Sequence, residues 1–357
     1  VPGEAVRISL LVANRGAAEA TVKQVKFDGF EADAACALAA VVAGGGGPGG
    51  GGRGGRGGDA APPAPLSSLR KDQVGRCDPT LKIKADERVT EPYWHRAGEA
   101  GIYTFDADAP FGLPNRPTPF TARVTFAFAG GEEVTEDVAI QYRYPGNIFS
   151  GEKRSDLLVV PAFSVRVSPE IAIVPEAAGA RPAAAKPVLP SREVRVTVVN
   201  GSNSAADSVV KLELPQGWTA TPPEQPVRFS REDESLTVRF QIRPAPGSAT
   251  GDYHVRATVP LAGRNHGRGY QIIEYPHIRR AHFYRDADAT LKVLNVRTAP
   301  NLTVGYVSGS GDEVAQFIEQ LGAKVEPLGA DALAWGDLSR YKSIVLGVRA
   351  YERRDDL

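Results

Sequence analysis

Histidines are the side chains best suited to metal or acid–base chemistry, and this sequence has only five of them. They are His95, His254, His266, His277 and His282. Only the last two are close in sequence, and a spacing of five residues does not place both on one helical face. A surface metal site that adds Asp286 and Asp288 is the alternative, but the set has no recognised ligand spacing. We therefore predict no metal site, no cofactor and no catalytic residue in this chain.

A glycine-rich loop at 308–313 (SGSGDE) follows a predicted strand and precedes a predicted helix, where phosphates often bind. A dinucleotide fingerprint would need a third glycine where Val314 stands. The acidic pair Asp312 and Glu313 also puts negative charge where a phosphate would lie. Ser310, three residues before Glu313, completes a capping-box pattern. We favour helix capping for this loop and keep Ser310 and Asp312 as candidate ligand-binding residues.

Arg349 follows a predicted strand whose end should lie beside that loop, at the edge where open α/β sheets hold ligands. It is a candidate for binding an anionic group, and an ion pair with Asp312 is the simpler prediction. An amidotransferase would instead need a nucleophilic cysteine on a sharp turn. No cysteine follows Cys77, so the sequence excludes that activity here.

Three large aromatic residues are candidates for binding sugar rings: Tyr93, Trp94 and Trp218. Each follows a proline, a tyrosine or a glycine near a predicted strand, so it could lie on a sandwich edge. Large aromatic side chains in small sandwiches are more often part of the core, and we favour that prediction.

The last part of the sequence, 301–357, has the pattern of alternating strands and helices. Apolar runs at 302–307, 324–328 and 343–348 predict strands, and the third is predicted to be buried. Between the first two, 312–321 has apolar residues at i, i+3, i+4 and i+7, and Gly322 then ends the helix. A second helical pattern spans 331–338. This order predicts a truncated flavodoxin-like α/β domain with parallel strands.

Upstream, short strands alternate in polarity and are separated by turn signals, which indicates Ig-like antiparallel β-sandwiches. The first is predicted over 1–165, where Val6, Ile8, Leu10 and Val12 share one face. Its further strands are predicted at 21–27, 81–85, 101–105, 121–128 and 136–144. The second is predicted over 166–275, with strands at 166–176, 192–199, 208–214, 226–229, 235–242 and 252–260. Residues 276–300, including a strand at 289–296, are predicted to connect it to the α/β domain.

Two segments have almost no capacity to form a core. Residues 44–65, within a Gly-rich insertion at 42–68, are nearly all Gly, Pro, Ala and Arg, and we predict that they are disordered. Two RGG triplets there resemble RNA-binding tails, but no aromatic residues are interleaved with them. An Ala/Pro-rich stretch at 177–190 predicts a second loop.

The overall composition restricts partners and location. The 42 basic and 42 acidic residues give a net charge of zero, so nothing in the balance attracts nucleic acid or an anionic membrane. No apolar run approaches the ~18 residues of a transmembrane helix. The sequence begins with Val and contains no Met, so we expect a fragment or processed product. Cys36 and Cys77 flank the Gly-rich insertion, and a disulfide and two free thiols both remain open.

Several motifs carry a family resemblance. Those in the α/β part are 304–312 (VGYVSGSGD), 320–322 (QLG) and 346–351 (LGVRAY), and those upstream are 91–94 (EPYW), 151–152 (GE), 159–161 (VVP) and 275–277 (YPH). Together they resemble the C-terminal region of large bacterial PIG-L family (LmbE-like) deacetylases. In that family a glutamine-amidotransferase-like domain follows a zinc-dependent catalytic domain and β-sandwich modules. The family's zinc-binding run, of His-Pro-Asp-Asp-Glu type, is absent from this sequence.

A second resemblance concerns the second sandwich. Residues 214–219 (LPQGWT), 238–244 and 251–253 (GDY) resemble the small Ig-like module that accompanies carbohydrate-binding domains in some α-galactosidases. The two resemblances imply a non-catalytic accessory region of an exported, periplasmic or extracellular N-deacetylase that acts on amino-sugars or glycans. Zinc and the catalytic domain would then belong to another part of the same parent chain. A carbohydrate-binding or adhesion module without enzymatic activity is the alternative.

Overall fold

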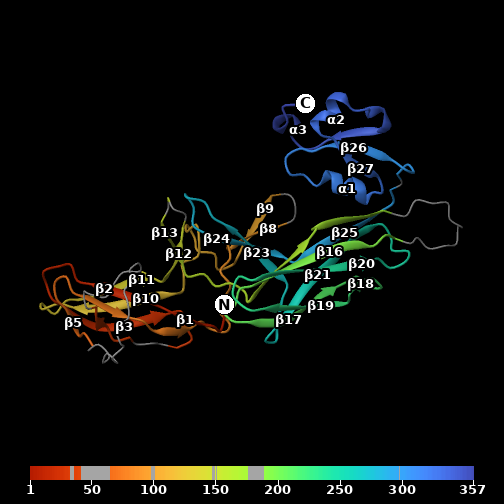
Figure 1. Cartoon of the computed structure of the whole chain (residues 1–357). Helices are drawn as coiled ribbons and strands as arrows, with labels where there is room; N and C mark the ends of the chain where they lie inside the picture. Colours follow the sequence, from red (N-terminus) through yellow and green to blue (C-terminus); the bar gives the residue numbers. More distant parts are fainter. Residues whose placement is uncertain are drawn as a thin grey trace, which may run out of the picture. The chain divides into compact units, whose positions relative to one another are not determined.

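Antiparallel β-sheets make up most of the fold, which confirms the mainly β class predicted from the alternating patterns (Figure 1). The computed structural model describes residues 1–32, 36–41, 65–97, 101–146, 149, 151–175, 189–296 and 298–357. They form two compact units, Val1–Pro161 with Ile272–Phe283, and Ala162–Gln271 with Tyr284–Leu357. The predicted disorder at 44–65 and the predicted loop at 177–190 concern residues that lie almost wholly outside the described ranges.

The first unit contains a four-stranded sheet, in the order β11-β10-β3-β5, and a three-stranded sheet, in the order β2-β6-β4. Three two-stranded sheets accompany them: β1-β7, β8-β9 and β12-β13. The strands are β1 (Ala5–Arg7), β2 (Leu10–Ala13), β3 (Ala20–Asp28), β4 (Ala39–Ala40), β5 (Ser68–Leu69), β6 (Val74–Cys77), β7 (Thr80–Lys82), β8 (Trp94–Ala97), β9 (Ile102–Phe105), β10 (Thr121–Ala127), β11 (Glu133–Ala139), β12 (Gln141–Pro145) and β13 (Glu152–Asp156).

Alternation along the strands builds the core of this unit, as predicted. Phe27, Ala122 and Val124 are almost completely buried there, and Val6 packs against them from β1. A register shift where β3 pairs with β10 places Val22 and Val25 on one side despite their odd spacing. Two predicted strands, at 6–12 and 136–144, are each divided in two. Their halves pair with different strands, because the chain passes from one sheet to another at residues 8–9 and 140.

Cys36 and Cys77 form a disulfide, which decides between the two possibilities left open by the sequence. Their Cα atoms are 6.1 Å apart, and 41 residues separate them along the chain. Cys77 is buried in the core of the first unit, so the link ties the ends of the long insertion to that core.

The second unit contains a β-sandwich of two sheets, in the orders β14-β16-β20-β18 and β15-β25-β21-β17-β19, with β22 paired to β21. All pairs are antiparallel except β15 with β25. The strands are β14 (Phe163–Ser168), β15 (Ile171–Pro175), β16 (Arg192–Asn200), β17 (Ala206–Glu213), β18 (Thr219–Thr221), β19 (Glu224–Phe229), β20 (Ser235–Arg243), β21 (Gly251–Leu261), β22 (Arg264–His266) and β25 (Asp288–Leu294). β23 (Arg268–Ile273) pairs with β24 (Ala281–Asp286) as a separate hairpin, of which residues Ile272–Phe283 belong to the first unit.

One predicted role in this unit is wrong. Residues 289–296 were expected to connect two domains, but β25 pairs with both β21 and β15 inside the sandwich. Ala289, Leu291 and Val293 are each at most 2% exposed and belong to the core. The strand adds to the sheet because its alternating apolar residues face that core.

A three-stranded parallel sheet in the order β27-β26-β28 forms the end of the second unit, as the α/β pattern predicted. Its elements are β26 (Thr303–Val307), α1 (Val314–Gln320), β27 (Lys324–Pro327), α2 (Ala330–Trp335), a 3-10 turn η1 (Leu338–Arg340), β28 (Ser343–Leu346) and α3 (Ala350–Arg353). The predicted burial of the third strand is wrong, since Ile344 and Leu346 are 41% and 42% exposed. β28 is an edge strand, so its run of apolar residues is not covered on both sides.

Candidate ligand-binding site

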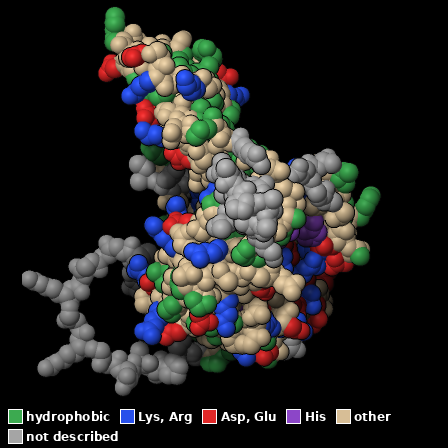
Figure 2. Space-filling view, turned by 90° about the vertical axis from the view of Figure 1, so that its right-hand side faces the viewer, with side chains coloured by type: hydrophobic (Ala, Val, Ile, Leu, Met, Phe, Trp, Pro, Cys, Tyr) green, Lys and Arg blue, Asp and Glu red, His purple; other side chains and the backbone are tan. Residues whose placement is uncertain are grey.

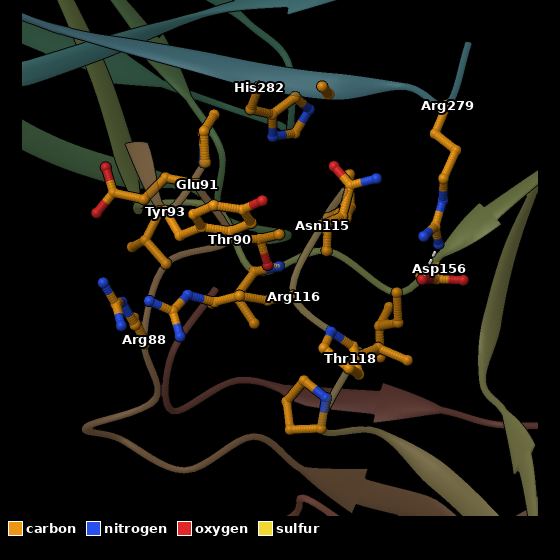
Figure 3. A pocket seen from close by; sticks show the side chains of 18 of the residues that line it. Arg88, Thr90, Glu91, Tyr93, Asn115, Arg116, Thr118, Asp156, Arg279 and His282 are labelled. Carbon is orange, nitrogen blue, oxygen red and sulfur yellow. Dashed lines mark hydrogen bonds and ion pairs between the residues drawn. The ribbon is translucent and has the colours of Figure 1, made fainter. Parts of the chain in front are cut away.

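A cavity of about 300 Å³ lies within the first unit (Figure 3). Four segments that are far apart in sequence line it: 87–93, 114–119, 155–159 and 279–282, together with Asp108. Of the lining residues, the sequence had singled out only Tyr93, as a sugar-binding candidate, and His282, in the metal site that was not favoured. Concave sites of this kind are where proteins usually bind small molecules.

Hydrogen bonds and an ion pair join three of the four segments. Thr90 and Val159 exchange two bonds, since each backbone N–H donates to an oxygen of the other residue at 2.9 Å. Arg279 forms an ion pair with Asp156 at one side of the cavity (Figure 3). Prolines at 114, 117 and 119 restrict the backbone of the loop that precedes β10. The lining is therefore preformed.

A network of charged side chains lies at the other side of the cavity, around Asp106. This carboxylate accepts hydrogen bonds from Arg88 at 2.5 Å, from Arg116 at 2.8 Å and from His95 at 2.8 Å. The bonds from His95, Arg116 and Arg88 lower the pKa of Asp106 to about 2. Arg116 also binds both carboxylate oxygens of Asp108, at 2.9 and 2.7 Å. Asp106 thus stays ionised at neutral pH and fixes the guanidinium groups of Arg88 and Arg116, which line the cavity.

His282 reaches the cavity from β24 and is 6% exposed (Figure 3). Burial, with the positive charge of Arg280, lowers its pKa to about 4. The imidazole is therefore neutral at physiological pH. Arg280 itself lies over the ring of Tyr144 at 5.1 Å.

Asn115 contributes a side-chain amide to the lining of the cavity. Among the described residues its side chain makes no hydrogen bond, and the residue is exposed at the cavity. An amide group can donate two hydrogen bonds and accept two. Near it, the hydroxyl of Tyr93 donates to the carbonyl of Leu113 at 2.7 Å, which fixes the orientation of the tyrosine ring.

Exposed aromatic side chains of the hairpin β8-β9 lie next to Tyr93, which lines the cavity, and to Trp94. We define the aromatic face of β8-β9 as Trp94, Tyr103 and Phe105. Trp94 lies directly opposite Phe105, and Tyr103 is two residues before Phe105 on the same strand, so the three side chains lie on one side of the hairpin. Ring centroids are 5.6 Å apart for Trp94 and Tyr103, and 6.1 Å apart for Tyr93 and Phe105. Tyr103 is 50% exposed and Phe105 is 64% exposed, so this face is open to solvent. Trp94 is half-buried rather than the core residue that we favoured.

Trp218, the third aromatic candidate, belongs to the core of the second unit. It is 6% exposed, and its ring centroid is 4.7 Å from that of Tyr253. Gly217 has a φ of +79°, which turns the chain so that the following indole points inward. Trp218 thus follows the favoured core prediction, and it lies in the other unit from Tyr93 and Trp94.

In the loop with Ser310 and Asp312, the Asp312 carboxylate already forms hydrogen bonds within the protein. The carboxylate of Asp312 accepts from the backbone N–H of Val314 at 3.2 Å, from that of Val348 at 2.9 Å and from the hydroxyl of Tyr306. Burial and that last bond raise the pKa of Tyr306 to about 12. These bonds tie the loop to the ends of β26 and β28.

Two predictions for this loop are wrong. Ser310 does not cap the helix, because α1 begins only at Val314 and the serine hydroxyl donates to the carbonyl of Val348 at 3.4 Å. Arg349 does not pair with Asp312. It pairs with Glu352 at 3.3 Å, and its φ of +55° begins the turn into α3.

The described ranges contain no group of three or more His, Cys, Asp or Glu residues that could hold a metal ion. In the same part of the chain, no helix has the length and apolar character that crossing a membrane requires. On the face shown in Figure 2, acidic and basic side chains are interspersed, and neither sign forms a large field.

The mainly β fold, with an Ig-like β-sandwich in the second unit, defines the general class of this protein. Within it, residues 191–261 match the family described as "NPCBM-associated, NEW3 domain of alpha-galactosidase". This match confirms the resemblance of the second sandwich to the carbohydrate-associated module of α-galactosidases. The match lies in the second unit, whereas the cavity lies in the first.

Comparison with curated proteins found no match. One similar solved structure is the native conformation of Escherichia coli alpha-2-macroglobulin, at 13% sequence identity and a TM-score of 0.23. That alignment covers 64% of this chain and 13% of the macroglobulin chain. A likeness at this level says nothing about function.

Proposed function

We propose that this chain is a non-catalytic, carbohydrate-associated accessory region of a larger enzyme. The match of residues 191–261 to a module of α-galactosidases is the observation that supports this most directly. The mainly β architecture fits a spacer or binding role, in which sandwiches position a catalytic domain against a glycan. The Cys36–Cys77 disulfide is compatible with an extracellular or periplasmic location.

We further propose that the parent enzyme is a PIG-L-like, zinc-dependent N-deacetylase. This rests on the resemblance of the motifs at 91–94, 275–277, 304–312 and 346–351. Zinc would be held by the catalytic domain of that parent, where it would supply an activated water for the hydrolysis of an N-acyl group. The part played by the present chain would be to place that domain on an amino-sugar or glycan.

Two measurements test this proposal. The open reading frame that encodes this sequence should also encode a His-Pro-Asp-Asp-type zinc motif, and a frame without one would favour the alternative, a carbohydrate-binding or adhesion module. The purified chain, incubated with zinc and N-acetylglucosamine oligomers, should release no acetate above a zinc-only blank. Zinc-dependent acetate release by this chain alone would overturn the accessory role.

A further inference from the structure

We propose that the cavity in the first unit and the aromatic face of β8-β9 together bind a neutral saccharide. The inference rests on the proposed carbohydrate-associated function and gives it a site, in a unit that the family match does not cover. One sugar ring would occupy the cavity, and the next would lie on the aromatic side chains beside it.

The size of the cavity suits a single sugar ring. Its volume of about 300 Å³ lies at the lower end of the range for small-molecule sites, about 300–1,000 Å³. It opens to solvent beside Asn115, which is exposed, so a chain of sugars can continue outward. The charged network and the Arg279–Asp156 pair enclose it from two sides (Figure 3).

The charges of the lining favour a neutral ligand. Four arginines, at 88, 116, 279 and 280, are balanced by four carboxylates, at 87, 91, 108 and 156. Three of these arginines already bind carboxylates: Arg88 and Arg116 bind Asp106 and Asp108, and Arg279 binds Asp156. An anionic ligand would have to compete with these carboxylates, and a cationic ligand would meet the guanidinium groups.

Hydroxyl groups suit such a lining because each of them can donate one hydrogen bond and accept two. The ionised groups offer strong, charge-assisted bonds to hydroxyls without losing their own partners. The amide of Asn115 adds a donor and an acceptor that no described residue uses. A saccharide presents several hydroxyls within one rigid ring, and this matches the number and variety of polar groups around the cavity.

The aromatic face extends the site beyond the cavity. The ring of Tyr93 lines the cavity and also contacts Phe105. Tyr103 and Phe105 then present rings that are half or more exposed. The C–H groups on one face of a sugar ring are apolar, so they pack on such rings while the hydroxyls at the ring edge stay in water.

The test is calorimetric titration of the full chain with four neutral tetrasaccharides, those of N-acetylglucosamine, cellulose, starch and mannan. Tri-galacturonic acid is the charged comparison. At least one neutral probe should bind. Asn115→Ala should weaken that binding about five- to tenfold, as the loss of a hydrogen bond implies. Tyr103→Ala should weaken it by a similar factor, through the loss of an aromatic contact.

Matched controls are Asn265→Ala and Tyr351→Ala, which alter exposed residues of the same types in the second unit. Both should leave the affinity unchanged, and urea unfolding should be the same for all four variants. Binding of no neutral probe at millimolar concentration, or of the charged probe alone, would overturn the site. Glycan binding that survives both Asn115→Ala and Tyr103→Ala would also overturn the site, while leaving the accessory function untouched. The reading frame and the acetate assay test that function separately.

Discussion

Replacing Trp218 by alanine tests whether this residue is a core side chain or a sugar-binding surface. Its ring is 6% exposed. Burying a tryptophan removes about 150–250 Å² from water, which at ~25 cal/mol per Å² stabilises the fold by about 4–6 kcal/mol. Substitutions of buried aromatic residues by alanine lower the free energy of unfolding by about 3–5 kcal/mol, and we expect that loss here.

The measurement is urea unfolding followed by far-UV circular dichroism, because removing a tryptophan changes the fluorescence signal itself. Hydrogen exchange of the amides in β20 and β21 assigns the change to the second unit. Trp218→Phe should lose less than Trp218→Ala, since a phenyl ring still packs against Tyr253. Glycan binding through the first unit should be unaffected.

Trp335→Ala is the matched control, because this tryptophan in α2 is 89% exposed. Its replacement should change the free energy of unfolding by less than about 0.5 kcal/mol. If Trp218→Ala unfolded at the same urea concentration as this control, and had lost glycan binding, the core assignment of Trp218 would be refuted.

Two further predictions concern the first unit. Reducing the Cys36–Cys77 disulfide, which closes a separation of 41 residues, should lower the free energy of unfolding of this unit by about 4 kcal/mol and leave the second unit unchanged. Unfolding with and without a reductant measures this, and equal stability would show that the link does not constrain the unfolded chain. His282 has a pKa lowered from 6.5 to about 4, so the unfolded state binds more protons between these pH values, and stability should fall as pH falls through that window. The loss is at most about 3 kcal/mol, at ~1.4 kcal/mol per pKa unit. It should be absent in His282→Gln, and an equal pH dependence in both proteins would contradict the assignment.

The alternation of apolar residues predicted most strands of both sandwiches, because a strand with one buried face must repeat every two residues. It failed where a strand changes partners, as at residues 8–9 and at residue 140. It also misplaced β25, since a connecting strand and a sheet strand have the same pattern. The helix α1 followed its apolar spacing, but its N-cap residue Glu313 makes no side-chain cap bond. Asp312 instead accepts a hydrogen bond from the backbone N–H of Val348, 36 residues away, and no local pattern contains that contact.

The sequence by itself determined the mainly β class, the parallel α/β end and the likeness of one sandwich to a carbohydrate-associated module, because local periodicity and motifs carry that information. Tyr93 and Trp94 were also identifiable as candidates. Only the tertiary structure decided that Trp218 is buried, that Arg349 pairs with Glu352, and that Arg88, Arg116 and Arg279 line one cavity. Burial and ion pairing depend on contacts between residues that are far apart in the chain, so no spacing along the sequence reveals them.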